Sequence, residues 1–296
     1  MNYFVPVTLA ALLSVPVALR AAEIPAGDTL VVTATRTEIP LADATVPVTV
    51  ISRDDIELSL AKDLSELLRF EAGIDIGRNG GPGQATSLFL RGTESNHTLV
   101  LVDGVRINPG TIGGAAIQNI SPGIIERIEI VNGARTALFG TDAIGGVINV
   151  ITRRTEDGYV EGGLGVGSFA SQSGHIAVGD RGSSGEFGVN LNWESTDGYA
   201  PRIDSDIERG YDNRSANLYA AREIGNSEIS VRHWQSEGNV EYLDFFLSPV
   251  DQDYRNSVTA VGWNTTLAEN GSSKLLLSLM AVSYTHLTLP TTCRVW

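Results

Sequence analysis

The most regular pattern in the chain is an alternation of apolar and polar residues that recurs between residues 155 and 280. In the segment 187–194, FGVNLNWE, apolar side chains alternate with glycine or polar residues, and the same period of two runs through 215–220 and 228–232. This period predicts antiparallel strands with one apolar and one polar face. A soluble β-sandwich and an outer-membrane barrel both contain such strands.

The connections between these strands separate the two architectures. Short glycine-rich turns at 182–185 and 225–226 alternate with a long acidic connection at 196–212. Outer-membrane barrels have short turns at one end and longer loops at the other. The pattern therefore favours a barrel, and it predicts that residues 155–280 form part of its wall.

Residues 47–154 have a mixed pattern that predicts a compact α+β domain of about 110 residues, a common domain size. We expect strands at 48–51, 87–90, 98–102, 128–131 and 146–152, a helix with Ser52 as N-cap, a second helix carrying Leu64, Leu67 and Leu68, a helical turn at 124–127, and a hairpin turn at Asp103-Gly104.

The two ends of the chain have patterns of their own. An apolar stretch at 4–19 followed by Ala21 and Ala22 predicts an export signal at 1–22. The alternative is a buried core segment at the start of a cytosolic domain. Residues 23–46 predict a linker. The alternation stops near Ala281, and we interpret residues 281–296 as a non-native tail on a C-terminally truncated chain.

The amino-acid composition argues against several classes of function. The 296 residues include 21 Lys+Arg and 35 Asp+Glu, and the net charge of −14 argues against a nucleic-acid-binding protein. Cys293 is the only cysteine, which excludes a disulfide framework and a thiolate metal cluster. The four histidines lie far apart, and the sequence has no recognisable Ser-His-Asp, paired-carboxylate or zinc-ligand arrangement. We therefore expect that the protein is not an enzyme.

Four segments carry a resemblance to a known family: DTLVVTATR (28–36), NGGPGQATSLFLRG (79–92), HTLVLVDGVRIN (97–108) and IERIEIVNGARTALFGTDAIGGVINVIT (125–152). Their order and spacing resemble the plug domain of TonB-dependent outer-membrane receptors, and within that family they are most similar to receptors for cobalamin. The resemblance implies a plug domain at 47–154 and a barrel of about 22 strands in the complete receptor. It also implies uptake of cobalamin or a related corrinoid by a monomer in outer-membrane lipid, powered by the periplasmic protein TonB.

Two alternatives stay open at this point. A ferric-siderophore receptor of the same family shares most of these plug segments. A passive structural or adhesive outer-membrane β-protein also contains the strands, but such a protein has no need for an energy-coupling segment.

The resemblance implies that one segment binds TonB, and we name it the coupling segment: Asp28, Thr29, Leu30, Val31, Val32, Thr33 and Ala34. An extended, β-branched segment can add as a strand to a partner's sheet through backbone hydrogen bonds. The alternative is that this segment is merely the first strand of the plug.

The resemblance further implies that two plug loops contact the substrate through Gly81, Pro82, Gly83, Gln84, Asn108, Thr111, Ile112 and Gly113. Plain turns are the alternative, because Gly and Pro mark turns in any protein. We expect Asp103 to have a structural role in closing its hairpin.

Calcium is the one cofactor that we expect. Clustered carboxylates on loops suit Ca²⁺, which takes about six to eight oxygen ligands. The family has a calcium site in corresponding loops, which implies these ligands here: Asp204, Asp206, Asp212, Asp244 and Asp251. The sequence departs from the family pattern at Ala200, where the family has Asp, and a solvated acidic surface is the alternative.

Overall fold

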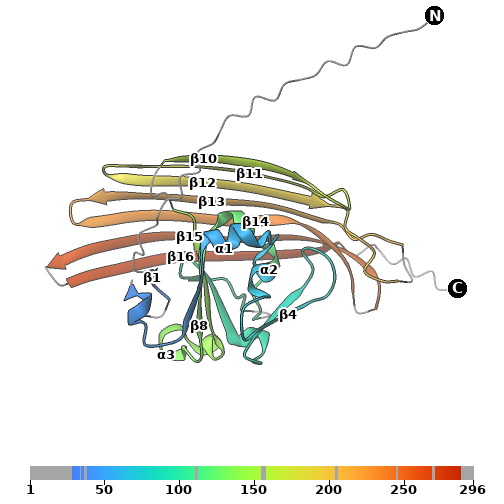
Figure 1. Ribbon diagram of the computed structural model, residues 1–296, viewed down its shortest axis with the longest axis horizontal. Helices are drawn as coiled ribbons and strands as arrows, with labels where there is room; N and C mark the ends of the chain where they lie inside the picture. The colour runs from blue at the N-terminus through green and yellow to red at the C-terminus, as the bar shows by residue number, and fades with distance from the viewer. Residues whose placement is uncertain are drawn as a thin grey trace, which may run out of the picture.

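The computed structural model describes residues 29–287, except 34, 37–38, 111–112, 155–157, 204–205, 245 and 269–270. The predicted export signal lies outside the described residues. Figure 1 shows a mixed α+β domain lying against one face of a long, curved antiparallel sheet. We call the first part the plug and the sheet the wall.

The plug is built on a five-stranded sheet with the order β3-β8-β9-β6-β7. Its strands are β3 (Val48–Ile51), β8 (Ile125–Asn132), β9 (Gly146–Thr152), β6 (Thr98–Val102) and β7 (Val105–Arg106). The pair β6 and β9 is parallel, and the other neighbours are antiparallel. All seven residues of β9 are buried, as expected for a central strand with both faces covered.

Smaller elements surround this sheet. They are the strand pairs β1 (Leu30–Val31) with β2 (Ile39–Pro40) and β4 (Ile74–Arg78) with β5 (Thr86–Leu90), the helices α1 (Arg53–Ser59), α2 (Leu64–Leu68) and α3 (Thr136–Phe139), and the 3₁₀ turns η1 (Leu41–Asp43), η2 (Ser95–His97), η3 (Ile117–Asn119), η4 (Pro122–Ile124) and η5 (Thr141–Ala143).

Helix α1 begins where the sequence predicts. The Ser52 side chain accepts a hydrogen bond from the Asp55 amide, and the Ser52 amide and hydroxyl donate to the Asp55 carboxylate at 3.0 and 2.6 Å. These bonds form a capping box, and they hold the pKa of Asp55 below its usual value. Asp63 caps α2 with a single bond, in which its side chain accepts from the Glu66 amide.

Three boundaries differ from the predictions. The helical turn expected at 124–127 is instead η4, because Ser121 caps a 3₁₀ turn with Pro122 at its start, and β8 already begins at Ile125. The predicted linker 23–46 contains β1, β2 and η1. The last strand does not stop at Ala281 but continues to Leu287, where it pairs with Asp251.

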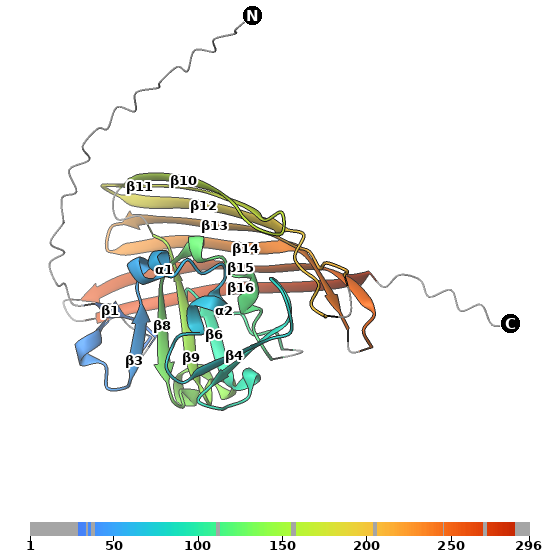
Figure 2. The same cartoon turned by 45° about the vertical axis from the view of Figure 1, so that its right-hand side comes forward.

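The wall contains seven strands in sequence order. They are β10 (Tyr159–Val166), β11 (Gln172–Gly182), β12 (Gly185–Thr196), β13 (Tyr211–Ile224), β14 (Ser227–Leu243), β15 (Pro249–Ala268) and β16 (Gly271–Leu287). Every neighbouring pair is antiparallel. Two-residue turns at 183–184 and 225–226 lie at one end, and longer connections at 197–210 and 244–248 lie at the other, as the sequence predicts. Figure 2 shows both ends of this sheet.

The two faces of the wall distinguish a barrel from a soluble sandwich. On β12 the apolar side chains of Leu191 and Trp193 are 46 and 42 % exposed, whereas the intervening Asn190 is 1 % exposed. The plug covers the polar face, and the apolar face is uncovered. A soluble sandwich packs its apolar faces together, so this arrangement is typical of a barrel that faces lipid.

Plug and wall share one hydrophobic core. The largest cluster of buried apolar residues joins plug residues such as Ile117 and Ile120 to Trp234, Val258 and Ala260 of the wall. The plug is therefore packed against the wall rather than tethered to it. Among the described residues no helix is long and apolar enough to cross a membrane.

Candidate functional site

The coupling segment contains β1, which lies at the short-turn end of the molecule in Figures 1 and 2. Asp28 and Ala34 lie outside the described residues, and Thr29 to Thr33 are described. Leu30 and Val31 pair with Pro40 and Ile39 of β2. The Leu30 side chain is exposed, whereas Val31 is completely buried.

A buried carboxylate holds the end of this segment against the plug sheet. Glu129 of β8 is fully buried, and its Oε2 accepts the backbone N–H groups of Val32 and Thr33 at 3.0 and 2.8 Å and the Thr33 hydroxyl at 2.6 Å. Its Oε1 accepts two N–H groups of Arg127 at 3.0 and 2.9 Å. A buried charge is tolerated when it is paired and hydrogen-bonded in this way.

The first predicted substrate loop lies at the opposite end, against the wall. Gly81, Gly83 and Gln84 are buried, and the Gln84 amide donates to the Glu241 carbonyl at 3.3 Å. Gly83 has a φ of +71°, and a Cβ at this position would collide with the Tyr211 ring. Glycine is therefore required both for the backbone conformation and for the close approach to Tyr211.

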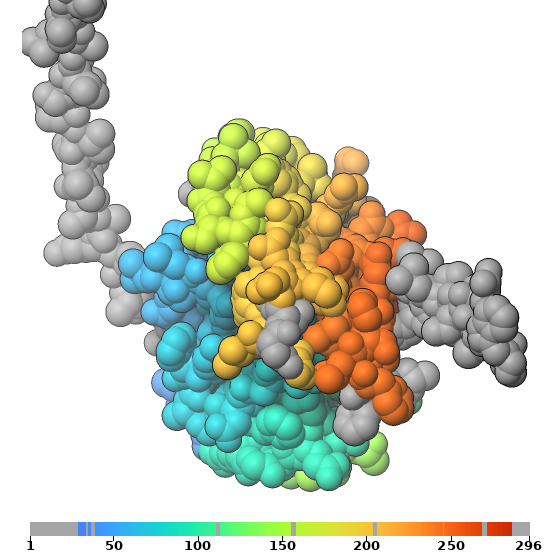
Figure 3. All heavy atoms as spheres, turned by 90° about the vertical axis from the view of Figure 1, so that its right-hand side faces the viewer, coloured from blue at the N-terminus to red at the C-terminus, as the bar shows by residue number. Residues whose placement is uncertain are grey.

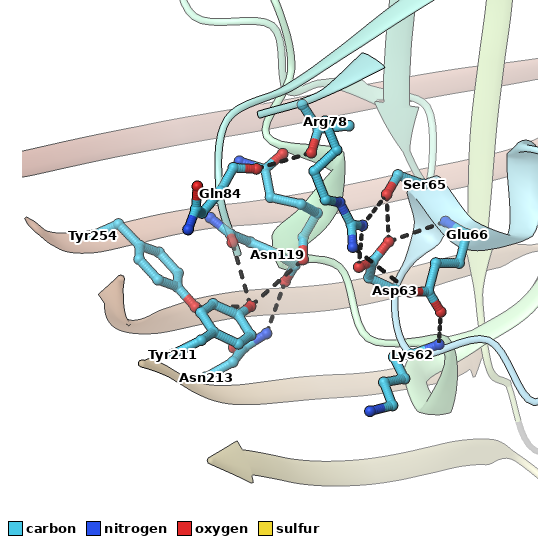
Figure 4. Close-up of polar contacts among 12 residues, drawn as sticks. Lys62, Asp63, Ser65, Glu66, Arg78, Gln84, Asn119, Tyr211, Asn213 and Tyr254 are labelled. Carbon is cyan, nitrogen blue, oxygen red and sulfur yellow. Dashed lines mark hydrogen bonds and ion pairs between the residues drawn. The ribbon is translucent and has the colours of Figure 1, made fainter. Parts of the chain in front are cut away.

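Asn119 of the plug is the centre of the polar contacts beside this loop (Figure 4). Its carbonyl accepts from the Ser236 hydroxyl at 2.8 Å and from the Asn213 amide at 3.3 Å. Its side-chain carbonyl accepts from the Tyr211 hydroxyl at 3.4 Å. These wall residues come from β13 and β14, and the contacts fix the loop end of the plug to the wall.

The second predicted loop, 108–114, is held from within the plug. The buried Asn108 side chain accepts from the Val100 amide at 2.7 Å and donates to the carbonyls of Thr98 and Gly113 at 3.0 and 2.7 Å. Because both its oxygen and its nitrogen are used inside the plug, Asn108 shapes the loop rather than offering a substrate contact in this conformation. Thr111 and Ile112 lie outside the described residues.

The predicted calcium ligands are not gathered into one site. Asp204 lies outside the described residues, and Asp206 and Asp212 are exposed. Asp244 accepts the amides of Phe246 and Ser248 in its own turn, both at 2.8 Å, and Asp251 accepts from the Asn239 amide. The described part of the chain holds no group of three or more His, Cys, Asp or Glu side chains that suits a metal ion. Calcium binding by these residues stays a prediction.

Figure 3 looks onto the end that carries the long connections, where the plug (blue to teal) lies beside the wall strands (yellow to orange). One comparison with known protein families covers this same plug. Residues 40–147 match the family model of the TonB-dependent receptor plug domain. The chain belongs to the TonB-dependent receptor family. Receptors of this family are proteins of the bacterial outer membrane, which is the location of this chain.

Two relatives show which members of the family the chain is similar to. The chain is 35 % identical over 243 residues to the vitamin B12 transporter BtuB of Photobacterium profundum, and 40 % identical over 228 residues to BtuB of Vibrio vulnificus. The matches cover 80 and 76 % of this chain but 40 and 37 % of those relatives. The chain thus spans about two fifths of the length of the relatives that it matches.

Solved receptors of this family have the same fold. The siderophore receptor PiuA of Acinetobacter baumannii matches with a TM-score of 0.68 at 18 % identity, over 84 % of this chain and 38 % of that one. The closed form of the ferric-catecholate import receptor Fiu from E. coli K12 matches with a TM-score of 0.67 at 16 % identity, over 83 and 38 %. The predicted plug and partial barrel are confirmed.

Sequence reasoning missed the residues that hold the two ends of the plug. Glu129 is an acidic residue inside the apolar run IERIEIV, and Asn149 is a polar residue inside GVINVIT. A polar residue at a position with buried neighbours needs a hydrogen-bonding partner, so both carried a signal. Asn119 and Tyr211 carried no such signal, because neither lies inside an apolar run of the sequence.

Proposed function

We propose that the complete receptor takes up cobalamin or a related corrinoid across the outer membrane and that TonB supplies the energy from the periplasm. The cobalamin assignment is supported by the names of the two relatives. The energy coupling is supported by one observation above all, the position of the coupling segment on the plug at the end with the short turns. In outer-membrane barrels that end faces the periplasm, where TonB is found.

The coupling segment combines two properties that suit a reversible contact. It already has extended backbone at Leu30–Val31, which can add to a partner's sheet through main-chain hydrogen bonds. It is held to the plug by a short β2 partner and by Glu129 rather than by a large apolar interface. Withdrawal of the segment exchanges these hydrogen bonds for new ones on the partner.

The plug loops then face the side from which substrate arrives. Residues 80–84 lie beside the long connections of the wall, which are extracellular in this class of barrel. The proposal assigns substrate contact to this loop and to loop 108–114. The Asn108 side chain stabilises the second loop through its hydrogen bonds inside the plug. The protein acts as a transporter rather than an enzyme, as one chain whose exposed wall face contacts lipid.

The test separates coupling from binding in the complete receptor. Leu30→Pro removes a backbone donor and fixes φ, so strand addition to TonB is blocked. We expect uptake of labelled cobalamin to fall at least about tenfold while equilibrium binding of cobalamin is unchanged. Leu30→Ala is the matched control, because it keeps the backbone donor, and it retains uptake.

Two outcomes would contradict the proposal. Equal loss of binding and uptake in Leu30→Pro, or full uptake by that variant, would remove the coupling role of residues 28–34. A receptor that binds a ferric siderophore and ignores cobalamin would remove the corrinoid assignment and leave the siderophore alternative.

A further inference from the structure

Asn149 of β9 links the coupling segment to the turn between β6 and β7. Its side-chain amide donates to the Thr33 hydroxyl at 3.0 Å, and its side-chain carbonyl accepts the Gly104 amide at 3.1 Å. Asn149 lies opposite Glu129 in the pairing of β8 and β9. The same side chain therefore touches the held segment and the β6–β7 hairpin.

The hairpin turn is attached to β9 at a second point. Asp103 accepts the Thr152 amide at 3.0 Å with one carboxylate oxygen and the Thr152 hydroxyl at 2.6 Å with the other. Its own amide donates to the Val150 carbonyl at 2.8 Å. The carboxylate is thus oriented by β9, and its neighbour Gly104 is oriented by Asn149.

The oriented carboxylate reaches the wall. Arg232 of β14 lies with its Nη1 at 3.2 Å from Asp103, and both side chains are largely buried. The Arg232 guanidinium also lies over the Tyr219 ring, 5.1 Å from its centroid, which holds it in place. This ion pair joins two residues that are far apart in the sequence and connects the body of the plug to the wall.

We propose that Asn149 and the Asp103-Gly104 turn form a relay, so that withdrawal of Thr33 from the plug loosens the Asp103–Arg232 anchor on the wall. The proposal rests on the proposed function, in which TonB performs the withdrawal. The relay makes the plug easier to displace only after the coupling segment has left it. The relay residues then connect a pull on the coupling segment to the release of the plug from the wall.

The physical reason lies at the start of the relay, where Thr33 and Asn149 are both buried and hydrogen-bonded to each other. When the Thr33 hydroxyl leaves, the side-chain amide of Asn149, which is 2 % exposed, loses its acceptor, and burial of an unpaired polar group is unfavourable. The Asn149 side chain then turns toward another partner and gives up the Gly104 amide. The turn loses its Gly104 bond to β9, and Asp103 is then held toward Arg232 only by its bonds with Thr152 and Val150, which weakens the anchor.

A double-mutant cycle in the complete receptor tests the relay. The measured quantity is the rate at which urea releases the plug from the folded barrel. Thr33→Val removes the hydroxyl at nearly constant volume, and Arg232→Gln removes the wall charge. We expect each single variant to release the plug faster than the parent receptor. The double variant should release it at least about twofold more slowly than the product of the two single effects predicts. In an Asn149→Ala background the two effects become independent.

Two controls match the variants. Thr29→Val changes an exposed threonine of the same segment, and Arg255→Gln removes an exposed wall arginine that pairs with Glu237. Neither is expected to show coupling with its counterpart. If a variant fails to fold, hydrogen exchange at the Gly104 amide gives a second readout, and Thr33→Val should speed it at least about threefold.

The relay would be overturned by two results together. The effects of Thr33→Val and Arg232→Gln would be independent in the receptor that retains Asn149, and hydrogen exchange at the Gly104 amide would be unchanged. Neither assay contains substrate or TonB. A failure here therefore leaves the transport proposal intact, and a failure of the uptake test leaves the relay intact.

Discussion

The plug and the wall bury opposite kinds of side chain. In the plug the fully buried residues include Leu68, Ile124 and Ile128, which are 0 % exposed. In the wall Asn190 and Asn217 are 1 % exposed, whereas Leu164 is 88 % exposed. The plug is organised like a water-soluble domain, and the wall has the reverse arrangement. The same amino-acid types therefore take different places because the two regions have different surroundings.

The comparison also shows what joins the two regions. The wall turns its polar face toward the plug, and the contacts at Asn119 and at the Asp103–Arg232 pair are hydrogen bonds and an ion pair. A cluster of apolar residues around Trp234 also buries side chains between the plug and the wall. Polar contacts can be exchanged for water at modest net free energy, which suits the proposed displacement of the plug.

The largest expected effect separates the two kinds of burial. Leu68→Ala in the plug core should lower the free energy of plug unfolding by about 3–4 kcal/mol, because it leaves a cavity among packed neighbours. Leu164→Ala on the exposed wall face should leave plug unfolding unchanged. Urea titration of both complete receptors measures the two effects, and equal losses would show that the two faces are not distinct.

The next effect tests the lipid-facing assignment. Leu191→Arg places a charge in the middle of β12 and should cost about 2–3 kcal/mol of barrel folding in lipid vesicles. Ile224→Arg, at the end of β13, should cost at most about 1 kcal/mol. The heat-modifiable gel band of the complete barrel reports folding. Similar small losses at both positions would argue that this face does not meet the bilayer core.

A smaller effect tests the close contact between the plug loop and the wall. Gly83→Ala should destabilise the plug by about 2 kcal/mol, because it adds a collision with Tyr211 to the strained backbone. Gly92→Ala has a similar φ of +75° but meets nothing within 4 Å, so it should show the backbone cost alone. Plug release in urea compares the two variants, and identical values would contradict the contact.

The smallest effect concerns the cap of α1. Ser52→Ala should cost about 1 kcal/mol of plug stability at neutral pH. The pKa of Asp55 is lowered in the folded plug, so its bond with Ser52 contributes above the ordinary value of 3.8 and is lost as the pH falls through the lowered pKa. The stability difference between the two proteins should therefore shrink in acid, and a difference that grows there would contradict the capping box.

The periodic elements of the fold could be predicted from the sequence. The wall strands follow from their alternation, and the β6–β7 turn follows from Asp103-Gly104 next to β-branched residues. The start of β8 was misplaced because Ser121 and Pro122 were not recognised as a 3₁₀ start. Strand β16 was ended too early because the alternation weakens there, although Val282 and Tyr284 are less exposed than their neighbours.

The contacts of the site could not be predicted in the same way. The coupling segment and the two loops follow from the resemblance, but their partners depend on strand register. One register step would turn Tyr211 away from Gly83 and Arg232 away from Asp103. The members of each pair are so far apart in the sequence that spacing gives no information about them, and only the assembled sheets bring them together.

The most direct test of the account concerns Glu129, which holds the coupling segment on the plug. A segment that is docked most of the time binds a partner more weakly than a free one, because its apparent affinity is multiplied by the undocked fraction. Glu129→Gln keeps the shape of the side chain but removes its charge and one acceptor oxygen, whereas Glu57→Gln on the exposed face of α1 is the control. We expect the complete Glu129→Gln receptor to bind the periplasmic domain of TonB about five- to tenfold more tightly than the parent and the control. Unchanged or weaker binding by Glu129→Gln would contradict the account.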